Sequence, residues 1–300
     1  MLHPLHVILA STVCLVSLKA GATGDRPVGA TPAGAVLFTR GDREALLGVL
    51  ERLSPDRGEP VAELTARAGL ALVGTPYVAG TLDGPGPERL VCDLRGLDCM
   101  TFVESALAIA RTRKCLAASA GPRAARSLFE AELAALRYRQ YPPSSYASRL
   151  HYFSDWIDHN ERRGVVEEIT RSLGGEADSR PVDFMTVHVD RYPPLADPEI
   201  LGAVGRVEAQ LTHSLRWILP VADVPRAESG IHEGDILALV PGTPGLDVSH
   251  LGLAHRTPDG VLHLLNASSI DRKVEVSAGS LTDYLKAHPK IVGIRVVRPL

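Results

Sequence analysis

The stretch LDCMTFVESALAIA, residues 97–110, predicts the helix around which the rest of the fold is organised. Asp98 is a favourable N-cap residue, which places Cys99 at the first helical position. Met100, Val103 and Leu107 recur at the spacing of one apolar helix face. A thiol at a helix start faces free backbone N–H groups and the positive end of the helix dipole, and both favour the nucleophilic thiolate. The alternative is an inert core cysteine, which is common in globular proteins.

The apolar pattern on either side of this helix predicts helices first and strands last. Residues 42–68 carry two helical patterns separated by Pro55 and Pro60. Residues 116–230 have a more helical than extended pattern, with a short extended piece at 184–197 that ends at a double proline. After Glu233 the apolar period changes to two, which predicts strands within 234–240, 249–256, 260–268, 273–277 and 291–299, and one further helix at 280–289. We therefore expect an α+β fold in which an antiparallel sheet packs against the helix that begins at Cys99.

Composition is that of an ordinary globular protein. The 300 residues are 45% hydrophobic and 22% charged, enough to bury a core. The net charge of −3 and the absence of a Lys/Arg-rich run argue against a nucleic-acid partner. Residues 1–22 contain a short apolar stretch and end in Ala-Gly-Ala, a pattern typical of a cleaved signal peptide and too short for stable membrane insertion.

These features predict the organisation of the chain. A signal peptide at 1–22 is followed by a flexible segment at 23–41 and by a single domain at 42–300, with a helical insertion at 116–230. Export to a bacterial periplasm or cell envelope follows from the signal peptide. No oligomeric state follows from the sequence.

Cysteine usage leaves at least one free thiol. Removal of residues 1–22 leaves Cys92, Cys99 and Cys115, an odd number, so one thiol stays unpaired in an oxidising compartment. A disulfide between Cys92 and Cys115 stays open, because the sequence does not fix their separation. The chain has no C-x-x-C or H-E-x-x-H pattern, so we expect no metal site, and nothing calls for a cofactor.

A cysteine nucleophile needs a base and a third polar group that holds the base. His250 begins a predicted strand and shares a face with Gly252 and Ala254, whose small side chains leave room for a helix terminus. His255 lies on the opposite face before a turn and is the weaker candidate. Asn266 ends the next strand, where its amide can meet the far nitrogen of His250. The alternatives are a strand-edge histidine and a turn asparagine.

Four motifs, in this order, resemble those of the NlpC-type, papain-like superfamily of bacterial cell-wall peptidases and amidases. They are GTPYVAG (74–80), LDCMTFVE (97–104), HEGDILAL (232–239) and SHLGLAHRTPDGVLHLLNAS (249–268). The resemblance implies a papain-like core with Cys99 as nucleophile, His250 as base and Asn266 as the residue that orients the base. It also implies that Tyr77 lies beside the nucleophile and either orients it or stabilises the oxyanion.

Further stretches resemble the N-acetylmuramoyl-L-alanine amidase-like family within that superfamily. They include DWIDHN (155–160), ITRSLGG (169–175), DFMTVHVDRYPPL (183–195) and IVGIRVVRP (291–299), and the resemblance runs from about Tyr77 to Arg298 with the insertion included. It implies a cysteine amidase that cleaves the amide between N-acetylmuramic acid, or its anhydro form, and L-alanine in peptidoglycan fragments (muropeptides).

The same resemblance implies a substrate cleft walled by the insertion. Trp156 could stack on a sugar ring, although its helical spacing also fits a core residue, and the other expected substrate contacts are Asp98, His188, Tyr192 and Ser249. Two other functions stay open. One is a γ-D-glutamyl-diamino acid endopeptidase with the same triad, and the other is a non-catalytic cell-wall binding protein.

Overall fold

The computed structural model describes residues 36–53, 58–84 and 86–300, all within the compact unit Ala33–Leu300. The predicted signal peptide at 1–22 and residues 23–35 of the predicted flexible segment lie outside the described residues. The remainder of that segment is folded, which corrects the predicted boundary at residue 42. The backbone of Leu37 pairs with Leu90 and Cys92, and α1 (Arg40–Arg52) begins two residues before that boundary.

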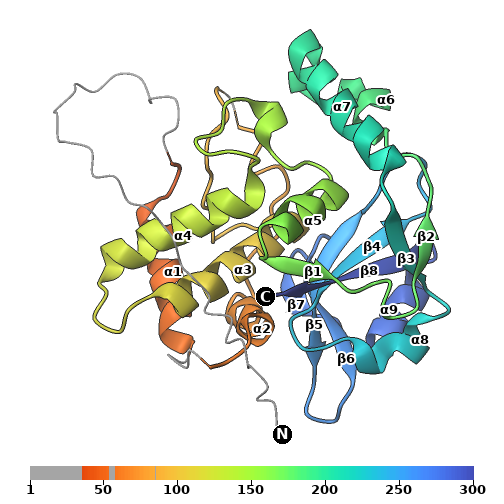
Figure 1. Cartoon of the computed structure of the whole chain (residues 1–300). Coiled ribbons are helices and arrows are strands. Elements are labelled where there is room, and N and C mark those ends of the chain that lie inside the picture. Colours follow the sequence, from red (N-terminus) through yellow and green to blue (C-terminus); the bar gives the residue numbers. More distant parts are fainter. Residues whose placement is uncertain (1–35, 54–57, 85) are drawn as a thin grey trace, which may run out of the picture. The chain divides into compact units, whose positions relative to one another are not determined.

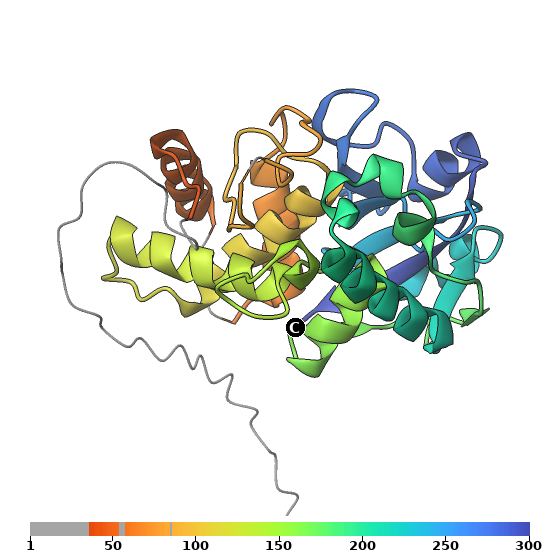
Figure 2. The ribbon, with the colours of Figure 1, turned by 90° about the horizontal axis from the view of Figure 1, so that it is seen from above.

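Helices cover one face of the sheet, as Figures 1 and 2 show for α1 to α4. The two predicted N-terminal helices are confirmed as α1 and α2 (Val61–Ala71), and α3 (Cys99–Cys115) packs between α2 and α4 (Pro122–Arg137). A fully buried ion pair joins α3 to α4, because Arg137 Nε donates to Glu104 Oε2 over 2.7 Å. This arrangement holds α3 against β5 and β6.

The sheet is antiparallel throughout, with the order β2-β3-β8-β4-β5-β6-β7. All five predicted strands are confirmed: β4 (Ile236–Pro241), β5 (His250–Arg256), β6 (Leu262–Ser268), β7 (Lys273–Val276) and β8 (Ile291–Pro299). The predicted helix near residue 280 is α9 (Leu281–Ala287). An α+β fold with an antiparallel sheet packed on α3 is therefore confirmed.

The insertion is mainly helical, as predicted, and it also contributes three short strands that the sequence did not predict. Two of its strands, β1 (Val166–Glu168) and β3 (Arg216–Pro220), pair with β8, and β2 (Glu176–Asp178) pairs with β3. Its remaining elements are η1 (Tyr146–Ser148), α5 (Phe153–Arg162), α6 (Phe184–Val187), η2 (Val189–Arg191), η3 (Pro193–Ala196), α7 (Pro198–His213), α8 (Val224–Ala227) and η4 (Glu228–Gly230).

The piece at 184–197 is a run of short helical turns rather than an extended segment, so that prediction is wrong. The reason is a tertiary contact. Glu208 on α7 is buried and accepts the backbone N–H groups of Met185 and Thr186 over 3.1 and 3.0 Å. A carboxylate that satisfies these free N–H groups stabilises a helical turn that the local pattern does not predict.

The two faces of the sheet belong to different apolar clusters. Leu251, Leu253 and Leu265 pack with the side chains of α3, whereas Ala254 and Leu264 pack with α9. The predicted alternation along β5 is therefore confirmed for these residues, and it turns the face that carries His250 toward α9.

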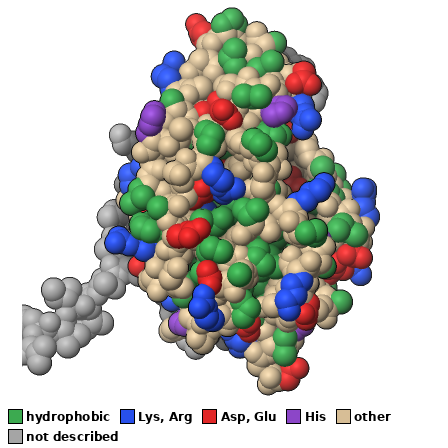
Figure 3. All heavy atoms as spheres, turned by 90° about the vertical axis from the view of Figure 1, so that its right-hand side faces the viewer, with side chains coloured by type: hydrophobic (Ala, Val, Ile, Leu, Met, Phe, Trp, Pro, Cys, Tyr) green, Lys and Arg blue, Asp and Glu red, His purple; other side chains and the backbone are tan. Residues whose placement is uncertain are grey.

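Two surface properties complete the description. In the described part of the chain, none of the helices combines the length and the apolar character needed to cross a bilayer. On the face seen in Figure 3, Lys and Arg side chains are interspersed with Asp and Glu, and neither sign forms a continuous patch.

Candidate active site

Cys99 is the first residue of α3, as predicted. A capping box fixes this turn: Asp98 Oδ1 accepts the Thr101 N–H over 2.8 Å, and the Thr101 hydroxyl accepts the Asp98 N–H over 2.9 Å. The Cys99 side chain is half-buried. The cap therefore holds the thiol at the half-buried start of a helix whose middle is buried in the core.

The start of α3 lies near the beginning of β5. The paired register of β5 with β6 runs from Leu253↔Leu265 to Arg256↔Leu262, although β5 begins at His250 and β6 continues to Ser268. The backbone N–H of Leu251 interacts with the Cys99 thiol and favours its ionised form. The thiol therefore lies next to the first residues of β5.

Gly252 is required for the approach of β6. A Cβ at this position would stand 2.8 Å from the Leu265 carbonyl oxygen and 3.0 Å from Asn266 Cβ. Because real Cβ atoms essentially never show contacts under 3.0 Å, any larger residue would push β6, and Asn266 with it, away from His250.

His250 and Asn266 form a hydrogen-bonded pair. Nε2 of His250 lies 2.8 Å from Oδ1 of Asn266, which is 1% exposed. Since an amide oxygen only accepts, Nε2 carries the hydrogen and Nδ1 is the nitrogen that can take up a proton. Cys99 and His250 line the same cavity of about 190 Å³, here called the catalytic cavity. The structure thus brings together the three residues predicted as a triad.

Burial decides the charge states of Cys99 and His250. Burial, and after it the Asp98 carboxylate, raises the pKa of the Cys99 thiol to about 12, although the N–H groups of Leu251, Met100 and Cys99 act in the opposite sense. Burial also lowers the pKa of His250, against the Asn266 hydrogen bond that raises it. The expectation that the helix start favours thiolate is therefore corrected, because desolvation is the larger effect. The resting pair is a thiol beside a neutral imidazole.

Tyr77 lies near Cys99, held by backbone contacts on both sides. Its N–H donates to the Arg272 carbonyl over 2.9 Å, and Tyr77 forms a parallel bridge with Leu97, two residues before Cys99. Burial, and then the charges of Cys99 and Asp98, raise the pKa of its phenol. Tyr77 is therefore a neutral O–H donor near the thiol.

Two larger cavities adjoin the catalytic cavity. The α9 cavity, about 400 Å³, shares Ser249 and His250 with it. The tyrosine cavity, about 670 Å³, shares Tyr192 with it and is named for Tyr192 and Tyr146. The three together form a run of adjoining hollows with the thiol and the imidazole at the centre.

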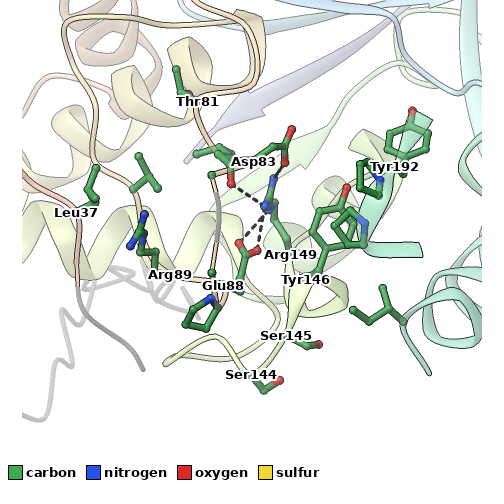
Figure 4. A pocket seen from close by; sticks show the side chains of 18 of the residues that line it. Leu37, Thr81, Asp83, Glu88, Arg89, Ser144, Ser145, Tyr146, Arg149 and Tyr192 are labelled. Carbon is green, nitrogen blue, oxygen red and sulfur yellow. Dashed lines mark hydrogen bonds and ion pairs between the residues drawn. The ribbon is translucent and has the colours of Figure 1, made fainter. Parts of the chain in front are cut away.

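The charged side chain of Arg149 lines the tyrosine cavity and is held by two carboxylates (Figure 4). Arg149 donates to Asp83 over 2.9 Å and to both oxygens of Glu88 over 3.0 and 2.9 Å. Its guanidinium lies 5.0 Å from the centre of the Tyr146 ring. The ion pairs and the cation–π contact hold Tyr146 in place as one wall of the cavity, and Tyr192 is another.

The residues predicted to contact substrate have different positions. Ser249 and Tyr192 line the catalytic cavity. Asp98 uses its carboxylate in the helix cap. The His188 ring packs against Phe184 with the ring centres 4.2 Å apart and the planes tilted by 30°, and its Nδ1 lies 2.8 Å from the Phe184 carbonyl oxygen. It is not among the residues that line any of the three cavities.

Trp156 is a core residue, which corrects its prediction as a sugar-stacking residue. Its side chain is 0% exposed and its ring stacks on Phe153 at 5.0 Å. A fully buried ring has no face to offer a ligand. The helical spacing that allowed both interpretations could not show which side of α5 faces the core.

His151 and Asp247 are titratable lining residues that were not predicted as site residues from the sequence. His151 lines the catalytic cavity, donates from Nε2 to the Tyr146 carbonyl over 2.8 Å, and has its pKa lowered by burial to about 3, so it stays neutral. Asp247 accepts the Ser154 N–H at the start of α5 over 2.8 Å and lines the same cavity. Both lie in irregular segments, where no periodicity indicates a role.

Other expectations concern thiols and metals. Cys92 is a free, buried thiol, so the disulfide to Cys115 that the sequence left open is not formed. Within the described ranges, no three His, Cys, Asp or Glu side chains are grouped so that they could hold a metal ion.

Comparison with known proteins identifies the family. The model of the N-acetylmuramoyl-L-alanine amidase-like family matches residues 67–294. A solved N-acetylmuramoyl-L-alanine amidase from Bacteroides uniformis ATCC 8492 is 35% identical over 80% of this chain and 98% of its own, with a TM-score of 0.73. A putative xylanase from Bacteroides fragilis is 38% identical over 77% of this chain and 98% of its own, with a TM-score of 0.70.

A more distant structure shares the fold alone. Protein LPG0564 from Legionella pneumophila is 22% identical over 87% of this chain and 93% of its own, with a TM-score of 0.60. No curated protein matches this chain significantly.

Proposed function

This chain belongs to the N-acetylmuramoyl-L-alanine amidase-like family, and we propose that it is a cysteine amidase of muropeptides. The bond it cleaves joins the lactyl carbonyl of N-acetylmuramic acid, or of its anhydro form, to the nitrogen of L-alanine. The observation that carries the proposal is that His250, hydrogen-bonded to the buried Asn266, lines the same cavity as Cys99. The amidase from Bacteroides uniformis supports the substrate class.

Attack begins from a neutral pair. As Cys99 Sγ bonds to the lactyl carbonyl carbon, its proton moves to Nδ1 of His250, because neither group is charged at rest. The carbonyl oxygen becomes an oxyanion, for which the Cys99 N–H and the Tyr77 hydroxyl are the nearby donors. Asn266 accepts from Nε2 and stabilises the imidazolium that forms.

Collapse of this intermediate releases the peptide. The imidazolium of His250 gives its proton to the nitrogen of L-alanine, the C–N bond breaks, and a thioester remains on Cys99. His250 then takes a proton from water as the water attacks the thioester. The thiol regains that proton, and the muramic acid leaves with a free carboxyl group.

The architecture and the location form part of the proposal. A cysteine at the start of a core helix, followed in the chain by a histidine and an asparagine on adjacent strands, supports a papain-like core. We propose the bacterial periplasm or cell envelope as the location, because residues 1–22 have the pattern of a signal peptide.

The tyrosine cavity is our candidate for the sugar. Tyr146 and Tyr192 offer aromatic faces, and Asp83 and Glu88 offer acceptors for hydroxyl groups. It adjoins the catalytic cavity through Tyr192. We assign sugar binding to this cavity because Trp156, the predicted sugar-stacking residue, is fully buried.

The endopeptidase alternative uses the same triad on the γ-D-glutamyl-diamino acid bond. A solved relative named as an N-acetylmuramoyl-L-alanine amidase favours the amidase over it. A binding protein has no need for a nucleophile and a base in one cavity, so the triad argues against that alternative.

The test is to incubate the protein with purified muropeptides and to identify the products by mass spectrometry. We expect release of the intact stem peptide beginning with L-alanine. A dipeptide left on the sugar would contradict the amidase and support the endopeptidase. Cys99→Ala is expected to abolish turnover. The matched control Cys92→Ala removes a buried free thiol outside the three cavities, and it is expected to keep turnover. Turnover by Cys99→Ala would show that the nucleophile is another residue.

A further inference from the structure

The residues that line the α9 cavity itself include basic side chains and no carboxylate, although Asp271, Glu275 and Asp283 line a neighbouring cavity that shares His288 with it. Of the residues that line the α9 cavity, His288 and Lys290 are the basic ones besides His250 of the triad, and none is Asp or Glu. The rest of the lining is apolar or hydroxylic, including Tyr284, Ser268 and Ile291. A cavity of this kind favours a ligand that carries a negative charge.

Both basic residues are attached to fixed backbone. His288 caps the end of α9, stacks on Tyr284 at 4.2 Å, and its Nδ1 lies 2.7 Å from the Tyr284 carbonyl oxygen. Since a carbonyl only accepts, Nδ1 carries the hydrogen and Nε2 is the nitrogen that can meet a ligand. The Lys290 carbonyl accepts the Gly242 N–H over 2.8 Å. In the part of the chain that the structure describes, Lys290 forms no ion pair.

The direction of the leaving group follows from the role of His250. The residue that protonates the leaving nitrogen must lie within hydrogen-bond reach of it, so this nitrogen lies next to the His250 imidazole. The α9 cavity is lined by His250 but not by Cys99, whereas the tyrosine cavity is lined by neither. Of the two larger cavities, only the α9 cavity is lined by His250, so it is the one next to the group that protonates the leaving nitrogen.

We infer that the α9 cavity binds the leaving peptide and that His288 and Lys290 select a carboxylate close to the scissile bond. The inference rests on the proposed amidase function and names the part of the substrate that is recognised. In a stem peptide, the first negative charge after the scissile bond is the α-carboxylate of the second residue. Two extended residues span about 7 Å, so this carboxylate stands close to the scissile bond.

The experiment compares two muramyl tripeptides that differ only in the second residue, whose α-carboxyl group is either free or a carboxamide. We measure kcat/KM for both with the wild-type protein, with Lys290→Glu and with the matched control Lys286→Glu. Lys286 is an exposed residue of α9 that does not line the cavity, so the control makes the same change of charge outside it.

We expect wild type and Lys286→Glu to favour the free acid by about tenfold or more, the size of one hydrogen bond to a charged group. Lys290→Glu is expected to lose or reverse this preference while still cleaving the carboxamide. Calorimetry with Cys99→Ala and the two intact tripeptides is expected to give the same order of affinities without turnover.

The outcomes separate the two proposals. Cleavage of the muramyl bond at equal rates for both tripeptides would overturn the inference and leave the amidase function intact. A preference that persists unchanged in Lys290→Glu and in His288→Gln would place the carboxylate elsewhere and would also overturn it. Failure of the wild-type protein to cleave either tripeptide would refute the amidase function and the inference with it.

Discussion

Replacement of Asn266 tests the proposed catalytic pair most directly. Its Oδ1 accepts from His250 Nε2 over 2.8 Å, and at 1% exposure no bulk water can replace it. When the imidazole becomes charged in the transition state, this becomes a hydrogen bond to a charged group, worth about 1.5–3 kcal/mol. Asn266→Ala should therefore lower kcat by about 10- to 150-fold at the pH optimum.

The pH dependence gives the prediction a sign. The Asn266 hydrogen bond raises the pKa of His250, against the larger effect of burial that lowers it. Removal of the bond in Asn266→Ala lowers this pKa further, so the acid limb of kcat/KM should move to lower pH. In Asn266→Asp, a carboxylate beside the imidazolium raises the pKa, and the limb should move to higher pH.

The assay is the release of stem peptide from a muropeptide, followed as kcat/KM across the acid range for wild type and both variants. Circular dichroism and urea unfolding check that each variant is folded. Shifts of the acid limb in the same direction, or no shift in either variant, would refute the reasoning that Asn266 sets the proton affinity of the base.

Three further predictions follow from particular contacts. His255→Ala should stay active while His250→Ala does not, because His255 Nδ1 bonds Glu233 over 2.8 Å and does not line the catalytic cavity; equal losses of kcat/KM would contradict this. Gly252→Ala should lower the free energy of unfolding in urea by about 1–3 kcal/mol and reduce kcat, because its Cβ would meet β6; unchanged stability and activity would show that β6 is not in close contact. Burial lowers the pKa of His151 from 6.5 to about 3. Below pH 6.5 the unfolded state therefore binds a proton before the folded state does. The wild-type protein loses stability as the pH falls, by at most about 1.4 kcal/mol per pH unit. His151→Gln should reduce that loss of stability in thermal melts between pH 7 and 4. A stability difference from wild type that is the same at every pH would contradict the role of His151 in this pH dependence.

Local signals allowed much of the fold to be predicted. The N-cap at Asp98 defined the start of α3, and the change of period after Glu233 defined the five strands from β4 to β8. The strands of the insertion could not be predicted in this way. Strands β1 and β2 have only three residues each, too few to show a period, and they form because the distant β8 and β3 offer backbone partners.

In the candidate site as well, local sequence features were predictable, and features that depend on distant elements were not. Cys99, His250 and Asn266 were named from their order in the chain, and the structure places them together. The strand-face argument was wrong in its reason, because Gly252 and Ala254 face β6 and α9, whereas α3 packs on Leu251 and Leu253. The charge state of the thiol was not predictable, because burial depends on elements far away in the chain and outweighs the helix start. The same reason applies to Trp156, whose burial depends on the core around α5.

The central position of β8 has a consequence for the biogenesis of this protein. β8 is the last strand in chain order, yet it pairs with β1, β3 and β4 and so joins the insertion to the strands that carry the histidine and the asparagine. Until β8 is in place, these three partners present open edges that can pair with other chains. Folding of the sheet therefore has to await β8, and a holdase that covers those edges should raise the yield of folded protein more than one that binds the finished domain.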